Sequence, residues 1–103
     1  MNLDDMIGGW FVGDFEPSVI RTKDFEVAVK RYKAGDKEAR HVHKVATELT
    51  VIISGKVLMN SQQYGEGSII EIPPNTSSDF EAIENTVTVV VKTPSVSGDK
   101  YVL

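Results

Sequence analysis

The sequence predicts an all-β fold for this chain. Short stretches rich in Val, Ile, Thr and aromatic residues recur along it, separated by Gly, Pro, Asn and Asp at intervals typical of sandwiches and barrels. Helical periodicity is hard to find in any part of the chain. The length of 103 residues allows one hydrophobic core and is too short for two ordinary domains, so we expect one domain over residues 1–103.

Glycines and prolines mark the ends of the expected strands. Gly55 favours a tight hairpin between two apolar stretches, because glycine readily adopts a positive φ. Pro73 and Pro74 end another strand, because proline cannot donate a hydrogen bond to a sheet. We expect the tail after residue 93 to form a loop that returns to pair with the body. The expected strands are residues 10–15, 19–22, 25–32, 40–43, 48–53, 56–59, 62–64, 68–72, 78–82 and 87–93.

Composition excludes several classes of partner. The net charge is -4, and Lys and Arg form no dense positive stripe, so nucleic acid is not an expected partner. The chain has no cysteine, so any metal must use nitrogen and oxygen ligands. The N-terminus is acidic and no apolar run approaches the roughly 20 residues that span a bilayer, so we expect no membrane association and a cytoplasmic location.

The two histidines of the chain are two residues apart, at His41 and His43. In an extended strand, this spacing places both imidazoles on one face. Glu48 lies five residues further on and reaches the same point only if the chain bends in between. Two imidazoles and one carboxylate on one side of an ion form the facial triad of non-haem iron, which leaves coordination positions open. We therefore predict a divalent metal site whose ion is Fe, Mn, Zn, Ni or Co.

These residues belong to a longer pattern. Gly35, His41, His43, Glu48 and Gly55 have the spacing of the first signature motif of the cupins, and the chain resembles that superfamily. Every spacing of the motif is met. The resemblance extends from residue 35 to about residue 84, about half of the chain.

The second cupin motif is present in a weaker form. Gly67 and Pro73 match it, but Asn75 stands at its glycine position and Ser78 stands where its histidine normally lies. The fourth metal ligand of the family is therefore missing. Ser78 remains open as a ligand that acts through a bound water. Asp79 is chemically the better ligand, but strand alternation directs it away from the face that holds Ser78.

The resemblance implies a double-stranded β-helix, or jelly-roll barrel, of six or more strands. It also implies a metal in the mouth of the barrel, a small-molecule ligand or substrate, and a homodimer. The substrate itself is not implied, because cupins serve many functions.

Strand alternation predicts which other side chains surround the site. Thr50 and Ile52 share the face of Glu48, while Phe80 and Ala82 share that of Ser78, so we expect a mostly apolar pocket. In the strand 25–32 we expect Phe25, Val27 and Val29 to face the interior. Trp10 and Phe11 are candidates for a ligand or subunit contact. Arg40, Lys44, Tyr32, Tyr64 and Lys92 are candidates for binding an anionic substrate if they point inward.

Three functions are open at this point. The first is a metal-dependent enzyme, an oxygenase or isomerase, that acts on a small metabolite. The second is a non-catalytic module that binds a small molecule or saccharide, which the weakened second motif favours. The third, ranked lowest, is a metal-free sugar-nucleotide epimerase, because related barrels move a proton with histidine, a carboxylate and a tyrosine.

Overall fold

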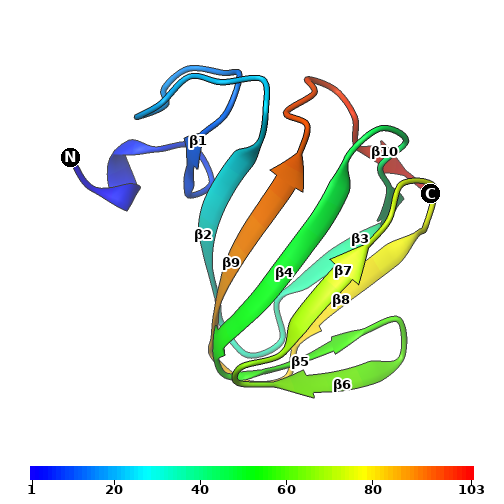
Figure 1. Cartoon of the computed structure of the whole chain (residues 1–103). Coiled ribbons are helices and arrows are strands. Elements are labelled where there is room, and N and C mark those ends of the chain that lie inside the picture. The colour runs from blue at the N-terminus through cyan, green and yellow to red at the C-terminus, as the bar shows by residue number, and fades with distance from the viewer.

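The structure is a computed structural model that describes residues 1–103. Two five-stranded antiparallel sheets face each other and form a jelly-roll barrel, which confirms the expected all-β fold (Figure 1). The first sheet has the order β1 (Trp10–Val12), β2 (Glu26–Tyr32), β9 (Thr86–Thr93), β4 (Thr47–Ser54) and β7 (Ile69–Ile72). The second has the order β10 (Tyr101–Val102), β3 (Lys37–Val42), β8 (Ser78–Ala82), β5 (Lys56–Met59) and β6 (Gln62–Gly65).

A hydrophobic core fills one end of the barrel. The inward positions of β4 change along the strand from Glu48 through Thr50 to Ile52, and those of β8 change from Ser78 through Phe80 to Ala82. Polar side chains therefore gather at one end of these strands and apolar ones at the other. The core consists of Ile52, Val57, Met59, Ile70, Ile72, Phe80 and Ala82, with Tyr32 and Tyr64 packed against it.

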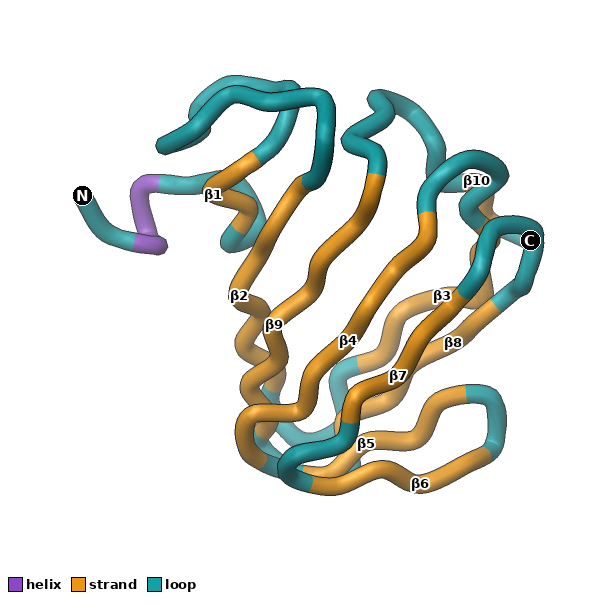
Figure 2. Tube along the Cα trace, viewed as in Figure 1, coloured by secondary structure: helices purple, strands orange, loops and turns teal.

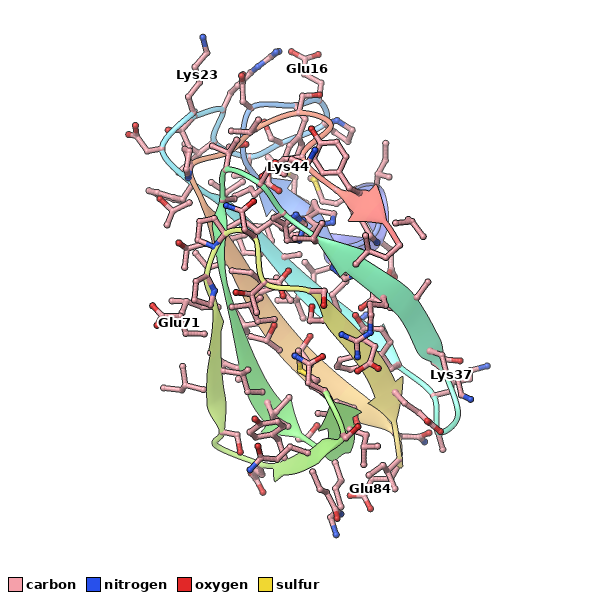
Figure 3. The ribbon with its side chains drawn as sticks, turned by 90° about the vertical axis from the view of Figure 1, so that its right-hand side faces the viewer. Glu16, Lys23, Lys37, Lys44, Glu71 and Glu84 are labelled. Atoms are coloured by element: carbon pink, nitrogen blue, oxygen red, sulfur yellow. The ribbon has the colours of Figure 1, made fainter.

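The polar end carries the long loops. Figure 2 shows loops before β2 and after β9 at the end of the barrel opposite the β5–β6 hairpin. Lys44, which directly follows the histidine pair, lies towards the same end as Glu16 and Lys23, whereas Lys37 and Glu84 lie towards the other (Figure 3). The loops and the polar end of the barrel therefore lie together.

Several expected strands differ from the observed ones. Residues 19–22 form no strand and contribute only an isolated bridge between Ile20 and Val12. The first strand ends at Val12, before Gly13, which has a φ of 153°. The strand that carries His41 begins at Lys37, earlier than expected, and ends at Val42, so that His43 lies just beyond it. The tail does return to the body, because β10 pairs with β3, as expected.

The expected orientation of β2 is wrong. Ala28 is fully buried and Lys30 and Tyr32 line an interior cavity, whereas Phe25, on the expected inward face, is 43% exposed. The large apolar side chains Phe25, Val27 and Val29 suggested the opposite face. The physical reason is that this part of the barrel encloses polar groups, so the burial of apolar side chains does not decide the orientation of β2.

The only helix is a single 3₁₀ turn, η1 (Leu3–Asp5). The structure therefore contains no helix with the length and apolar character needed to cross a bilayer.

Candidate metal centre

A β-bulge in β3 directs His41 into the barrel. The strand pairs Glu38 with Phe80 and His41 with Ser78. An advance of three residues along β3 is therefore opposite an advance of two residues along β8. A bulge of this kind inserts one extra residue and changes the alternation of side chains. Glu38 and His41 consequently both line the interior cavity although they are an odd number of residues apart.

Asp99 stabilises the bend between His43 and Glu48. The Asp99 carboxylate accepts hydrogen bonds from the backbone N–H groups of Lys44, Val45 and Ala46 at 2.9 to 3.2 Å. Three successive N–H groups that point at one carboxylate form a tight anion-binding turn. The bend that Glu48 requires is therefore present, and a residue of the C-terminal tail holds it.

The three predicted ligands lie together. One side-chain donor atom from each of His41, His43 and Glu48 lies within 4.8 Å of the others. His41 is 7% exposed and His43 is 4% exposed, and their rings meet edge-on with centroids 5.1 Å apart. The ligand atoms are thus close enough to surround one ion and are largely removed from bulk water.

Backbone carbonyls fix the tautomers of both histidines. His41 Nδ1 lies 2.9 Å from the Ala39 carbonyl oxygen, and His43 Nδ1 lies 2.8 Å from the Asp99 carbonyl oxygen. A carbonyl only accepts, so each Nδ1 carries a proton and donates it. In the neutral imidazoles, each Nε2 then keeps its lone pair, as a metal ligand must.

The Nε2 atom of His43 has no hydrogen-bond partner although it is buried. The nearest carboxylate oxygen, Glu48 Oε1, is 3.5 Å away. Buried polar atoms without a partner are uncommon in folded proteins, because each one costs the free energy of its lost hydration. Coordination of a cation by the free lone pair of Nε2 would remove this cost. The donor set therefore fits a divalent metal ion.

Opposing effects act on the pKa of Glu48. Burial raises the pKa of its carboxyl, but the neighbouring His43 and the positive charge of Lys92 outweigh burial, so the pKa lies below its ordinary value. Thr50 Oγ1 also donates to Glu48 Oε2, at 3.4 Å. The carboxylate is therefore ionised at neutral pH, as a ligand has to be.

Ser78 and Asp79 occupy different environments. Ser78 is 2% exposed, pairs with His41 in the β3–β8 ladder and lines the cavity. The Asp79 carboxylate binds Arg40 at 2.9 Å and accepts a hydrogen bond from the backbone N–H of Asn60 at 2.8 Å. Asp79 also lines the cavity, but it is not part of the cluster of ligand atoms, and its oxygens are engaged by Arg40 and Asn60.

A cavity of about 130 Å³ adjoins the cluster. Thr50 and Phe80 line it as expected, whereas Ile52 and Ala82 belong to the core. The cavity is more polar than expected, because lysines and glutamates line it as well. Its charged and hydroxyl-bearing lining residues are Lys30, Tyr32, Glu38, His41, Glu48, Thr50, Ser78, Asp79, Thr88, Lys92 and Lys100.

The candidate anion-binding residues divide into two groups. Tyr32 and Lys92 point into the cavity. The other three do not. Arg40 binds Asp79, and Tyr64 packs against the core. Lys44 Nζ lies 4.2 Å from the centroid of the Tyr101 ring. Trp10 lines the cavity, and Phe11 does not.

Four charged residues of the site were not predicted from the sequence. Lys30 follows once the face of β2 is corrected, because it is two residues from Ala28. Glu38 depends on the bulge, for which the sequence shows no signal. Asp99 and Lys100 reach the site only because the tail returns, and no motif marks them.

Comparisons of the fold agree with this architecture. No model of a known protein family matches the chain, and neither does any curated protein. A double-stranded β-helix protein from Klebsiella pneumoniae is similar over 99% of this chain and 88% of its own, with a TM-score of 0.75 and 21% identity. A cupin-2 domain protein from Shewanella frigidimarina is similar over 70% and 72%, with a TM-score of 0.61 and 14% identity.

An enzyme also has this fold. The DMSP lyase DddQ from Ruegeria pomeroyi is similar over 88% of this chain and 48% of its own, with a TM-score of 0.73 and 16% identity. At such identities the comparisons show the fold, and the chemistry has to be argued from the site itself.

Proposed function

We propose that this chain, which has the double-stranded β-helix fold of the cupin superfamily, holds a divalent metal ion through His41, His43 and Glu48. The buried, unpartnered Nε2 of His43, 3.5 Å from Glu48 Oε1, is the observation that carries the proposal. Fe, Mn, Zn, Ni and Co all accept two imidazoles and a carboxylate. A bound ion of this kind supplies a Lewis acid or an oxygen activator to the cavity.

We further propose that the protein is a metal-dependent enzyme, an oxygenase or isomerase acting on a small metabolite. Three protein ligands leave coordination positions open to a substrate, and the adjoining cavity of about 130 Å³ provides room for a small one. The similarity in fold to a lyase supports catalysis, because it shows that such a barrel can carry an active site.

Titration of metal-depleted protein tests the metal proposal. We expect wild type to bind one equivalent of Zn²⁺ or Co²⁺ by calorimetry, and His43→Ala and Glu48→Gln to lose this binding. Asp79→Asn is the matched control, because its carboxylate binds Arg40 outside the cluster. Equal affinity in wild type and His43→Ala would refute His43 as a ligand.

A non-catalytic binding module is the second candidate, because Ser78 occupies the position of the fourth ligand. Turnover that disappears in His43→Ala distinguishes the enzyme from the module. Turnover that requires His43 in a protein without metal affinity would favour metal-free proton transfer instead. The family resemblance also predicts a homodimer, which sedimentation equilibrium tests.

A further inference from the structure

Three lysines line the inner cavity beside the metal centre: Lys30, Lys92 and Lys100. Lys92 Nζ lies 3.7 Å from a carboxylate oxygen of Glu26, and Lys100 Nζ lies 3.9 Å from one of Glu38. Lys30 has no carboxylate oxygen within 4.0 Å. It is half-buried, and burial lowers its pKa. Lys30 therefore presents a partly desolvated ammonium group without an ionic partner.

Trp10 brings two of these ammonium groups together. Lys30 Nζ lies 5.1 Å and Lys92 Nζ lies 4.9 Å from the centroid of its indole ring. Both lysines belong to one face of the β2–β9 pair, in which Glu26 is opposite Lys92 and Lys30 is opposite Thr88. The ring attracts both cations but offsets only part of the repulsion between them. An anion bound beside both lysines would offset the rest, so the arrangement is suited to an anion.

We propose that Lys30 and Lys92 form a subsite for the carboxylate of a small organic acid, which is the substrate class of the metal centre. This inference rests on the proposed function, since a second polar group of the acid would face His41, His43 and Glu48. Lys92 already shares its charge with Glu26, so one uncompensated cation, Lys30, remains for the ligand. A singly charged carboxylate matches this charge better than a doubly charged phosphate.

The space agrees with a small acid that has an apolar end. The inner cavity, of about 130 Å³, is the smaller of the two cavities beside the metal centre. A second cavity of about 300 Å³ adjoins it and shares Trp10, Lys92 and Lys100. Its apolar lining residues are Ile7, Trp10, Phe15, Pro17, Ala46, Pro94 and Val96. The carboxylate belongs in the inner cavity, and an alkyl group extends into the outer one.

Trp10 gives a direct readout because it is the only tryptophan of the chain. The experiment follows its emission while purified protein of measured metal content is titrated with acetate and butyrate. Acetamide and butyramide are the uncharged controls, and inorganic phosphate is the second anion. We expect saturable changes with both carboxylates, tighter binding of butyrate, and none with the amides. Lys30→Met should weaken binding by about tenfold or more, because a charged hydrogen bond is lost.

Four variants separate this subsite from the metal. Lys30→Arg should retain carboxylate binding, and Lys56→Met, which changes an exposed lysine on β5, should leave it unchanged. Lys30→Met should keep the metal content of wild type, whereas His43→Ala should lose the metal and keep the Lys30-dependent change. Four outcomes would each overturn the subsite. These are carboxylate binding that is equal in wild type and Lys30→Met, binding of the amides as tight as that of the carboxylates, binding of phosphate tighter than that of the carboxylates, and a titration of wild type that does not saturate. None of these outcomes bears on the metal.

Discussion

The Asp99 backbone carbonyl accepts a hydrogen bond from His43 Nδ1 at 2.8 Å, while the Asp99 carboxylate binds the turn that follows His43. One residue of the C-terminal tail thus orients an imidazole and also holds the bend that brings Glu48 to it. Outer partners of this kind fix the orientation of a metal ligand. The proposed metal centre therefore depends on a residue far from it in sequence.

Replacement of the Asp99 carboxylate should weaken both the fold and the metal site. Asp99→Ala leaves the N–H groups of Lys44, Val45 and Ala46 without their acceptor, which should lower the free energy of unfolding by about 2 kcal/mol. Metal affinity should fall about 10- to 100-fold. Urea unfolding and metal calorimetry measure the two effects. Glu66→Ala is the control, and an affinity equal to wild type in Asp99→Ala would show that the turn does not position the ligands.

The lowered pKa of Asp99 predicts how the free energy of unfolding changes at acid pH. Burial raises its pKa, but the three backbone hydrogen bonds outweigh burial and hold the pKa below the ordinary 3.8. A carboxyl whose pKa is lower in the folded state stabilises the protein above its unfolded pKa, and this stabilisation is lost as pH falls through the folded pKa. The difference in unfolding free energy between wild type and Asp99→Asn should therefore be constant from pH 7 to about 5. It should narrow below about pH 4. A difference that persists undiminished at pH 3 and below would contradict this assignment.

The raised pKa of Tyr32 predicts how the free energy of unfolding changes at alkaline pH. Its hydroxyl donates to Glu38 Oε2 at 2.9 Å, and its ring packs on Phe80. Burial and the charge of Glu38 raise its pKa far above the ordinary 10.0. The unfolded chain thus loses this proton first, so stability should fall as pH rises above 10. The free energy of unfolding, measured with urea, should decline less steeply in Tyr32→Phe between about pH 9 and 11, since position 32 then has no phenol to ionise. Parallel declines in the two proteins would exclude Tyr32 as the cause.

Gly9 holds the segment that carries Trp10. Its φ is +79°, and a Cβ atom there would meet the Val29 carbonyl oxygen. Gly9→Ala should lower the free energy of unfolding by about 1–3 kcal/mol more than Gly35→Ala. Gly35 is the control because its φ of +92° is also positive, while nothing lies within 4 Å of its Cβ position. Thermal unfolding compares them, and equal losses would mean that the contact with Val29 is easily relieved.

The sequence predicted the ligand cluster more fully than its surroundings. His41, near the end of β3, and His43, just beyond it, are two residues apart and reach the same point. Glu48 joins them through a bend that its spacing requires. These relations are local, so the order of residues reveals them. Lys30 was missed because the large apolar side chains of β2 suggested the wrong face, although a polar cavity, and not the core, adjoins that strand.

The remaining differences come from interactions between distant parts of the chain. The bulge that lets Glu38 share the interior with His41 depends on the register between β3 and β8. Asp99 lies beside His43 in a structure in which the following strand, β10, pairs with β3. The register between β3 and β8 is not encoded in a local pattern of apolar and polar residues, so the bulge was not visible in the sequence. The return of the tail was expected, but no local pattern shows which of its residues reaches His43.

The metal content of untagged protein tests the central claim most directly. Protein from cells grown in metal-replete medium, purified without a polyhistidine tag or chelator, is measured by elemental analysis together with His41→Ala, His43→Ala and Glu48→Gln. We expect close to one equivalent of a first-row divalent metal in wild type and a large loss in each variant that remains folded. Wild type that is folded and free of metal, or variants that keep the full equivalent, would contradict a metal centre at His41, His43 and Glu48.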